Sequence, residues 1–254
     1  MRKVRRLPWP RRRPASTNTE FIPRPGRGSA RASLGVAVAE KPYVPALRFH
    51  ALTGLYDAMV AILCREKAFK AALVAQADLG PGQKVLDLGS GTGTMTIALK
   101  SACPGASLIG VDADPVVLAL ARAKARRMDS DVTFFRSFAQ DLDPGLGPFD
   151  RVVTSLFLHH IPASGREAVL ERVRSSLKEG GEFHIADWDR PANALQWLGF
   201  SLVRILDGWE LTRGHAEGRM EEWLRQAGFQ NVTRTRSFHT PLGTLSLWSA
   251  QAQA

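Results

Sequence analysis

Ten consecutive residues carry the strongest structural signal in this chain: Val85-Leu86-Asp87-Leu88-Gly89-Ser90-Gly91-Thr92-Gly93-Thr94. The apolar residues at the start predict a buried strand that carries an acid near its end, and residues 95–99 continue with the spacing of a helix. Glycines between a strand and a helix permit positive φ angles and let a ligand approach the backbone. The segment therefore predicts a strand, a ligand-binding turn and a helix in succession.

The residues on either side extend this alternation along the chain. Short apolar runs separated by stretches of helical periodicity are typical of a parallel sheet with helices on both faces, so we expect an α/β fold. The sequence predicts strands at 84–88, 107–111, 131–135, 150–155, 181–187, 230–237 and 243–250. It predicts helices at 94–102, 115–127, 165–178, 191–207 and 218–227, preceded by a helical pattern over 47–79.

Two kinds of ligand compete for the glycine-rich turn. A dinucleotide-binding turn has the pattern Gly-x-Gly-x-x-Gly. Here the third glycine, Gly93, comes one position early, and Thr94 stands where that pattern needs glycine. The carboxylate of Asp87, just before the turn, also suits a cationic amine and sulfonium better than a pyrophosphate. A nicotinamide-linked oxidoreductase is therefore the least supported interpretation.

The strand, the acid and the turn together resemble the first motif of class I S-adenosylmethionine-dependent methyltransferases, which has the form acid-x-Gly-x-Gly-x-Gly. The resemblance extends over about residues 47–250. It implies a Rossmann-like sheet of seven strands, mostly parallel with an antiparallel last strand, and S-adenosyl-L-methionine as the cofactor. It also implies that Asp87 helps to hold the methionine amino group of the cofactor. The residues expected to shape the turn around the cofactor are Gly89, Ser90, Gly91 and Gly93.

Two further acids extend the resemblance. Asp112 ends the next predicted strand, 23 residues after the first glycine of the turn. An acid about 20 residues downstream of such a turn accepts hydrogen bonds from ribose hydroxyls, and the resemblance gives Asp112 this role, with Ala113 along the adenine. The alternative role for Asp112 is a helix N-cap, which Asp114 suits better. The resemblance also places Asp141 at the adenine amino group and Leu142 on its ring; the alternative for Asp141 is a solvated loop acid.

The residues that take part in the reaction are harder to identify. Methyl transfer needs alignment of the partners and exclusion of water, and it needs a base only when the acceptor loses a proton. Residues 149–162 resemble the family's fourth motif, but the strand ends in Ser155 and not in Asn-Pro-Pro-Tyr, which disfavours adenine-N6 and glutamine acceptors. We expect Ser155 to line the site. His159 and His160 are candidates for a base or for pocket walls, and Tyr56 for a lid over the cofactor; a structural role is the alternative for all three.

The chain is expected to have three parts around this core. Residues 1–45 predict a disordered basic arm rich in proline and arginine, followed by one domain over 46–254. Within that domain, residues 46–80 are expected to form lid helices and residues 188–218 a roof over the acceptor. The apolar stripe of the roof, over 194–206, favours a place in the core more than contact with a membrane.

The charge distribution limits the choice of partners. The chain has a net charge of +10, and residues 1–48 contain 12 of its 34 basic residues but only two of its 24 acidic ones. The remaining chain is therefore neutral overall, which argues against nucleic acid as the main partner. No apolar run reaches the roughly 18–20 residues of a membrane-spanning helix, so we expect a soluble protein. The isolated Cys64 and Cys103 predict free thiols in a reducing compartment and neither a disulfide nor a metal site, so we expect a cytoplasmic protein. The alternative is a targeting leader within the arginine-rich residues 1–45.

The leading hypothesis is a methyltransferase without a metal ion, acting on a small-molecule acceptor. An apolar roof points weakly to an apolar or amphiphilic acceptor, such as a quinone precursor or a lipid. One alternative is an RNA or protein methyltransferase that uses the basic arm. Another is a regulator that binds S-adenosylmethionine without turnover. Peripheral contact with a membrane and the oligomeric state stay open at this level.

Overall fold

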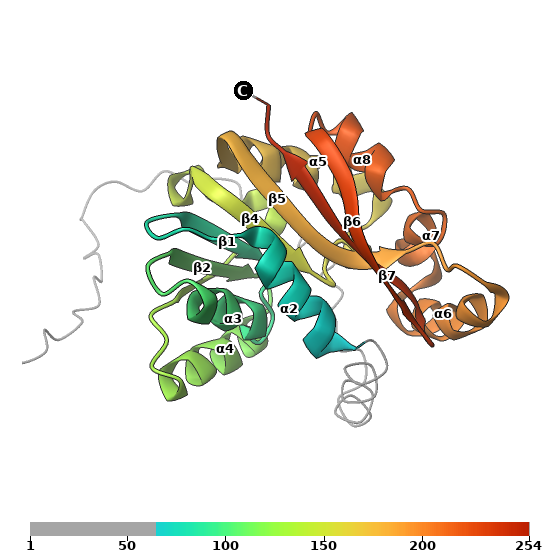
Figure 1. Ribbon diagram of the computed structural model, residues 1–254, viewed down its shortest axis with the longest axis horizontal. Helices are drawn as coiled ribbons and strands as arrows, with labels where there is room; N and C mark the ends of the chain where they lie inside the picture. Colours follow the sequence, from blue (N-terminus) through green and yellow to red (C-terminus); the bar gives the residue numbers. More distant parts are fainter. Residues whose placement is uncertain (1–64, 254) are drawn as a thin grey trace, which may run out of the picture. The chain divides into compact units, whose positions relative to one another are not determined.

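The computed structural model describes residues 65–253. The expected arm, most of the expected lid helices and Tyr56 lie outside the described residues. The described chain contains one sheet of seven strands in the order β3-β2-β1-β4-β5-β7-β6 (Figure 1). The strands are β1 (Lys84–Leu88), β2 (Ser107–Asp112), β3 (Thr133–Arg136), β4 (Phe149–Ser155), β5 (Leu177–Asp189), β6 (Gln230–Thr240) and β7 (Gly243–Gln251). The pairs among β1 to β5 are parallel, and β7 is antiparallel to both β5 and β6, which confirms the expected fold class.

Helices pack on both faces of the sheet because successive strand residues point to opposite sides. In β1, Val85 packs with Leu73 on one side, whereas Leu86 packs with Val169 and Leu224 on the other. The helices are α2 (Glu66–Ala77), α3 (Thr94–Ala102), α4 (Pro115–Arg127), α5 (Ala163–Ser176), α6 (Ala194–Asp207), α7 (Trp209–Ala216) and α8 (Met220–Gln226). Three short 3-10 turns also occur: η1 (Ala139–Asp141), η2 (Pro144–Leu146) and η3 (Leu158–His160). Figure 1 shows α2 across the face opposite α5 and α8.

Most helices and strands lie close to their predicted residue ranges, and the strand whose bounds differ most from the prediction is β5. The sequence predicts a helix that ends at residue 178 and a strand that begins at residue 181. In the structure the helix ends at Ser176, and Leu177 already pairs with Phe149 of β4. The next pair joins Arg151 and Glu182, so β5 bulges between Leu177 and Glu182. The segment with Gly180 and Gly181 is therefore part of a bulged strand and not a turn between the predicted helix and the predicted strand.

The apolar stripe of the roof is largely exposed, which corrects the expectation of a place in the core. Only one side of α6 is buried, and its residues Phe200 and Val203 pack with Trp188 and Leu242. The other apolar residues of α6 lie around the rest of the helix, where no described element covers them. Among the described residues, no helix has the length and apolar character needed to cross a membrane.

Candidate functional site

Three of the predicted acidic and polar residues meet at one edge of the sheet. Strand order places β2 and β3 on one side of β1 and β4 and β5 on the other, so the order reverses between β1 and β4. Ligands of such sheets bind beyond the carboxyl ends of the strands at this switch point. Asp87 near the end of β1, Asp112 at the end of β2 and Ser155 at the end of β4 all lie at that edge.

Asp87 is a buried carboxylate with one unsatisfied oxygen. Its residue is 1% exposed, and its Oδ2 accepts a 2.6 Å hydrogen bond from the hydroxyl of Thr96 on α3. Oδ1 has no hydrogen-bond partner among the described residues. Burial raises the pKa of Asp87 to about 6, against the opposing effect of the Thr96 hydrogen bond. A buried oxygen in this state fits a cationic hydrogen-bond donor such as a primary ammonium group.

The three glycines of the turn serve different purposes. A Cβ at Gly89 would lie 2.3 Å from the ring of Phe157, and a Cβ at Gly93 would lie 2.8 Å from the ring of Phe134. Both positions therefore need glycine for internal packing. Gly91 has a φ of 51°, and no atom lies within 4 Å of the position of its Cβ. Its backbone thus borders open space that a bound molecule can fill, as a cofactor turn requires.

Asp112 supports the turn through its side chain. Its Oδ2 accepts from the backbone N–H of Gly91 at 2.8 Å, and its Oδ1 accepts from the N–H of Asp114 at 2.9 Å. A carboxylate oxygen can accept two hydrogen bonds, so each oxygen retains capacity for a hydroxyl. Asp114 caps α4 by accepting from Val116, which confirms its predicted N-cap role. Ser90, also in the turn, is buried, and its hydroxyl has no hydrogen-bond partner among the described residues.

The residues expected around an adenine differ in their accessibility. Asp141 is exposed at the end of η1, whereas Leu142 is buried in the main apolar core. The carbonyl of Leu142 accepts a hydrogen bond from Nε of Arg172 at 2.8 Å. The side chain of Leu142 therefore offers little surface to a ligand in this structure. Ala113 is half-buried at the start of the loop after β2.

A cluster of histidines and acids lies beside this edge. Nδ1 of His159 is 2.6 Å from Oδ1 of Asp187, and its Nε2 is 3.7 Å from Oδ2 of Asp207. The ring of His160 lies 4.0 Å from that of His159, centroid to centroid. His215 meets His159 edge-on at 6.1 Å, and its Nδ1 is 2.9 Å from the carbonyl of Trp188. The elements η3, β5, α6 and α7 thus converge on one buried polar cluster.

The pKa values of the two neighbouring histidines are shifted in opposite directions. Burial lowers the pKa of His159, but the charge and hydrogen bond of Asp187 more than offset this and raise it above its ordinary value. Burial and the adjacent charge of His159 lower the pKa of His160 to about 3. The protonated form of His159 is therefore favoured, and its two ring nitrogens face the carboxyl groups of Asp187 and Asp207. His160 is neutral and can accept a hydrogen bond, although it is a weak base.

Several residues of the site were not identified from the sequence. Asp187 and Asp207 hold His159, and Thr96 orients Asp87. Leu156, which follows Ser155, has a φ of 52°. The left-handed region costs a leucine about 1 kcal/mol or more, and such strain is concentrated at functional sites. An acid near the carboxyl end of β5 could have been suspected, because parallel strands place their carboxyl ends at the same edge, but the strand contains both Asp187 and Asp189 there and the sequence does not distinguish them.

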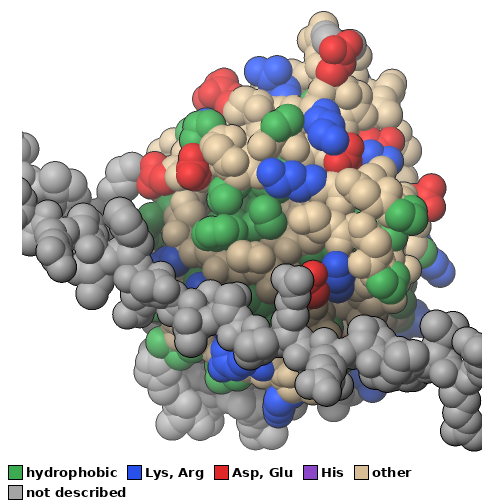
Figure 2. Space-filling model, turned by 90° about the vertical axis from the view of Figure 1, so that its left-hand side faces the viewer, with side chains coloured by type: hydrophobic (Ala, Val, Ile, Leu, Met, Phe, Trp, Pro, Cys, Tyr) green, Lys and Arg blue, Asp and Glu red, His purple; other side chains and the backbone are tan. Residues whose placement is uncertain are grey.

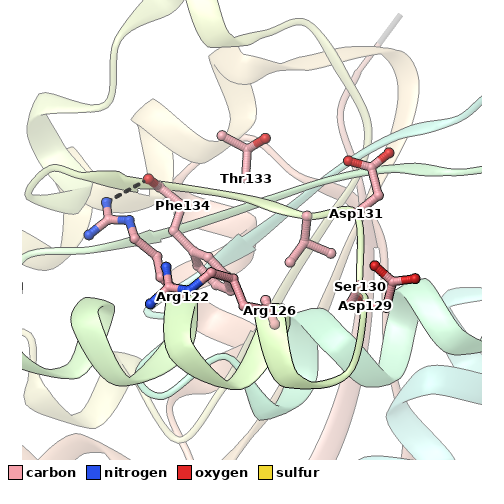
Figure 3. A pocket seen from close by; sticks show the side chains of 9 residues that line it. Arg122, Arg126, Asp129, Ser130, Asp131, Thr133 and Phe134 are labelled. Carbon is pink, nitrogen blue, oxygen red and sulfur yellow. Dashed lines mark hydrogen bonds between the residues drawn. The ribbon is translucent and has the colours of Figure 1, made fainter. Parts of the chain in front are cut away.

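Two hollows on the described surface lie along α4, and the larger of them is also lined by Thr92 of the glycine-rich turn. One, of about 560 Å³, lies between α4 and the beginning of β3 and includes Arg122, Arg126, Asp131 and Phe134 (Figure 3). The other, of about 700 Å³, lies over α4. Neither contains a predicted site residue. Within residues 65–253, no group of three His, Cys, Asp or Glu side chains is placed to hold a metal ion.

Comparison with known proteins adds independent information. A family model described as a methyltransferase domain matches residues 85–181. An uncharacterised methyltransferase of Synechocystis is 36% identical over 160 residues, which cover 61% of this chain and 71% of that protein. A ribosomal protein L11 methyltransferase of Thermus thermophilus is 39% identical over 103 residues, 41% of this chain and 37% of that protein. A ubiquinone/menaquinone biosynthesis C-methyltransferase of Pasteurella multocida is 27% identical over 220 residues, 78% of this chain and 81% of that protein.

The fold also matches a solved structure with a bound ligand. The magnesium protoporphyrin IX methyltransferase of Synechocystis, solved with S-adenosylhomocysteine, aligns with a TM-score of 0.56 at 23% identity. The alignment covers 77% of this chain and 84% of that one. At this identity, the likeness establishes a shared fold.

Proposed function

This chain belongs to the class I S-adenosylmethionine-dependent methyltransferases, and from that premise we propose that its acceptor is a small apolar or amphiphilic molecule. The chain is thus an enzyme whose cofactor is S-adenosylmethionine. The proposed acceptor is a quinone-like or lipid-like compound.

The cofactor is assigned to the edge between β1 and β4. When bound, S-adenosylmethionine supplies a methyl group on a positively charged sulfur. Oδ1 of Asp87 would accept from the amino group of the cofactor, which supplies the partner that this oxygen lacks within the described chain. The backbone at Gly91 would border the cofactor, since a Cβ there meets only open space. Asp112 would accept from the ribose hydroxyls while it keeps its bonds to the turn, and Asp141 would lie at the adenine amino group.

The observation that carries the choice of acceptor is the apolar cover beside the carboxyl edge. Trp188, Phe200, Val203, Ala216 and Leu242 form one apolar cluster there, against the half-buried Leu156 that follows β4. The five residues of the cluster are buried against one another, and of the apolar residues there Leu156 alone is half-buried and retains exposed surface at the edge. Apolar surface at this place favours an acceptor that is itself apolar, because a polar or charged acceptor would lose hydration there. On the face that Figure 2 shows, which is the left-hand side of Figure 1 and lies away from α6 and α7, charged side chains of both signs are intermixed and form no continuous basic field.

The extent of the sequence matches supports the same choice. The match to the quinone methyltransferase covers 78% of this chain. The match to the ribosomal protein methyltransferase covers 41%. The longer match is too long to be confined to the cofactor-binding half and extends into elements on the acceptor side. We therefore favour the small-molecule acceptor over a protein acceptor.

In this proposal the histidines orient and surround the acceptor. His160 is neutral and can accept a hydrogen bond from it, while Ser155 lines the same edge. A pKa of about 3 makes His160 a poor base, so the acceptor needs a proton that is readily lost, as in an enol or a phenol. The nucleophilic atom of the acceptor bonds the methyl carbon as the carbon–sulfur bond breaks, the electron pair stays on sulfur, and the acceptor proton passes to solvent.

A methyl-label transfer assay tests the acceptor class. Purified full-length chain is given methyl-labelled cofactor and three separate pools: a lipid and quinone extract, ribosomal protein, and total RNA. We expect label in the extract, and we expect its loss in Asp112→Ala, which weakens cofactor binding. Label confined to protein or RNA would overturn the small-molecule proposal and leave the methyltransferase activity standing.

A further inference from the structure

Helix α6 exposes almost only apolar side chains. Its 14 residues include two charged ones, Arg204, which is 8% exposed, and Asp207, which is half-buried. A helix on the outside of a globular protein normally turns a polar face to water. We name the exposed residues the α6 apolar surface: Leu195 (73%), Trp197 (37%), Leu198 (73%), Leu202 (42%), Ile205 (70%), Leu206 (42%) and the adjoining Trp209 (51%).

The inner side of α6 is already packed and hydrogen-bonded. Phe200 and Val203 lie in an apolar cluster with Trp188 and Leu242. Gln196 accepts from the hydroxyl of Thr244 at 2.9 Å. The α6 apolar surface is therefore the second face of a helix whose first face is satisfied. A contiguous apolar surface of this kind marks contact with another molecule.

The aromatic residues suit the boundary between apolar and aqueous phases. Trp197 lies in the first turn of α6, and Trp209 follows its last residue after one glycine. The guanidinium of Arg204 lies 3.7 Å from the centre of the Trp209 ring. Tryptophan and arginine side chains combine an apolar body with a polar end, and they gather at the level of lipid headgroups.

We propose that the α6 apolar surface inserts into the headgroup region of an anionic lipid bilayer. The sequence supplies the matching charge, since residues 1–48 carry an excess of ten positive charges while the rest of the chain is neutral. A shallow apolar helix and a basic segment are each weak membrane anchors, and two such signals together give stable attachment. A second copy of the chain would also cover apolar side chains, but it would leave the charge excess of residues 1–48 without a partner.

Docking through α6 would place the reaction edge beside the bilayer. Asp207, the last residue of α6, lies 3.7 Å from Nε2 of His159 in the polar cluster. An acceptor dissolved in lipid would then have a short path to the enzyme. The proposal of docking itself does not depend on the identity of the acceptor.

Vesicle co-sedimentation of the full chain tests the proposal. The vesicles are phosphatidylcholine alone, or phosphatidylcholine with one third phosphatidylserine. The test variant is Leu198→Glu with Ile205→Glu, and the matched control is Val116→Glu with Leu120→Glu, two exposed apolar residues of α4. We expect wild type and the α4 variant to bind the anionic vesicles, and the α6 variant to bind about tenfold less tightly. We also expect both variants to retain thermal stabilisation by S-adenosylhomocysteine, which shows that they are folded.

Several outcomes would overturn the proposal. Wild type that fails to bind anionic vesicles, or an α6 variant that binds as tightly as wild type, contradicts it. If wild type sediments as a dimer, the α6 variant sediments as a monomer, and wild type does not bind vesicles, the α6 apolar surface is assigned to a second copy of the chain. Loss of binding after deletion of residues 1–45 supports the proposed charge contribution, whereas unchanged binding contradicts it. Methyl transfer to acceptors in detergent is measured separately, so a failure of docking is distinguishable from a failure of the proposed acceptor class.

Discussion

His159 and Asp187 form a buried ion pair that joins the segment after β4 to the end of β5, with 2.6 Å between Nδ1 and Oδ1. The same carboxylate accepts from two backbone N–H groups, that of Leu158 at 2.8 Å and that of Trp188 at 2.7 Å. Asp187 therefore fixes both the histidine and the backbone around it. Burial would raise its pKa, but the charge and hydrogen bond of His159 hold that pKa well below its usual range.

Replacing Asp187 should destabilise the protein strongly. Asp187→Asn keeps the shape of the side chain but leaves His159 buried without its closest anion. Breaking one partner of a buried pair costs about 3–5 kcal/mol of unfolding free energy. Urea unfolding at pH 6 measures this loss. Glu222→Gln on α8 is the control, and we expect it to lose far less stability because both side chains of its pair with Arg219 are exposed. Equal losses in both variants would refute a special role for Asp187.

The same pair predicts how stability depends on pH. His159 has a raised pKa in the folded state, so its stabilisation is complete below the ordinary value of 6.5 and is lost as the pH rises through the raised value. Asp187 has a lowered pKa, so its stabilisation is present above 3.8 and is lost as the pH falls through the lowered value. The pair therefore stabilises most between these limits. Unfolding free energies measured from pH 4 to 9 should decline on the alkaline side in wild type and less steeply in Asp187→Asn.

Asp87 should favour cofactor binding at the expense of stability. Its pKa of about 6 lies above the ordinary 3.8, so the stabilisation from protonation is present at low pH and lost as the pH rises through about 6. At pH 7.5 the ionised carboxylate thus costs the ligand-free protein on the order of 3 kcal/mol. We expect Asp87→Asn to raise the melting temperature of the ligand-free protein while it weakens the binding of S-adenosylmethionine more than tenfold. A variant that melts lower without ligand would show that the carboxylate is already well solvated.

Cofactor affinity should increase with pH over the same range. The ionised form of Asp87 is the one that pairs with an ammonium group, and it becomes dominant above about pH 6. Calorimetric titration of S-adenosylmethionine between pH 5 and 7.5 should show a falling dissociation constant. The dependence should flatten in Asp87→Asn, and an identical pH profile in that variant would assign the titration to another group.

Gly91 offers a test of the turn that separates binding from folding. Gly91→Ala places a methyl group in open space at a φ of 51°, and Gly82→Ala does the same at a φ of 82°, away from the site. Both changes should cost about 1 kcal/mol of stability from backbone strain. Only Gly91→Ala should also weaken the binding of S-adenosylhomocysteine, as measured by thermal shift at several ligand concentrations. Equal affinities in the two variants would remove Gly91 from the cofactor site.

Local patterns made most of the fold predictable. The sequence predicts β1, α3 and α4 with the bounds that the structure has, because each is marked by its own residues: an apolar strand, a glycine turn, and Asp114 followed by proline. The two acids at the ends of β1 and β2 follow from the same logic, since parallel strands bring their carboxyl ends together. Their roles toward the cofactor stay predictions.

Long-range relationships were not accessible in the same way. Asp187 lies 28 residues beyond His159, and nothing in the spacing tells which acid of β5 faces the histidine. The hydrogen bond from Thr96 to Asp87 could not be predicted either, since it depends on the rotation of α3 against β1. The exposure of α6 was hidden for another reason. An apolar stripe with helical periodicity normally marks the inward side of a helix, but in α6 the polar Gln196 and Arg204 lie on the buried side and the stripe faces outward.

The contact between Gly199 of α6 and the turn between β6 and β7 has a mechanical consequence. A Cβ at residue 199 would lie 1.9 Å from the carbonyl oxygen of Pro241, so the two backbones touch with no side chain between them to yield. An inward displacement of α6 therefore also displaces the turn between β6 and β7. Because β7 is paired with β5 from Asp189 back to Glu182, that displacement reaches the strand that holds Asp187 instead of being absorbed at the surface.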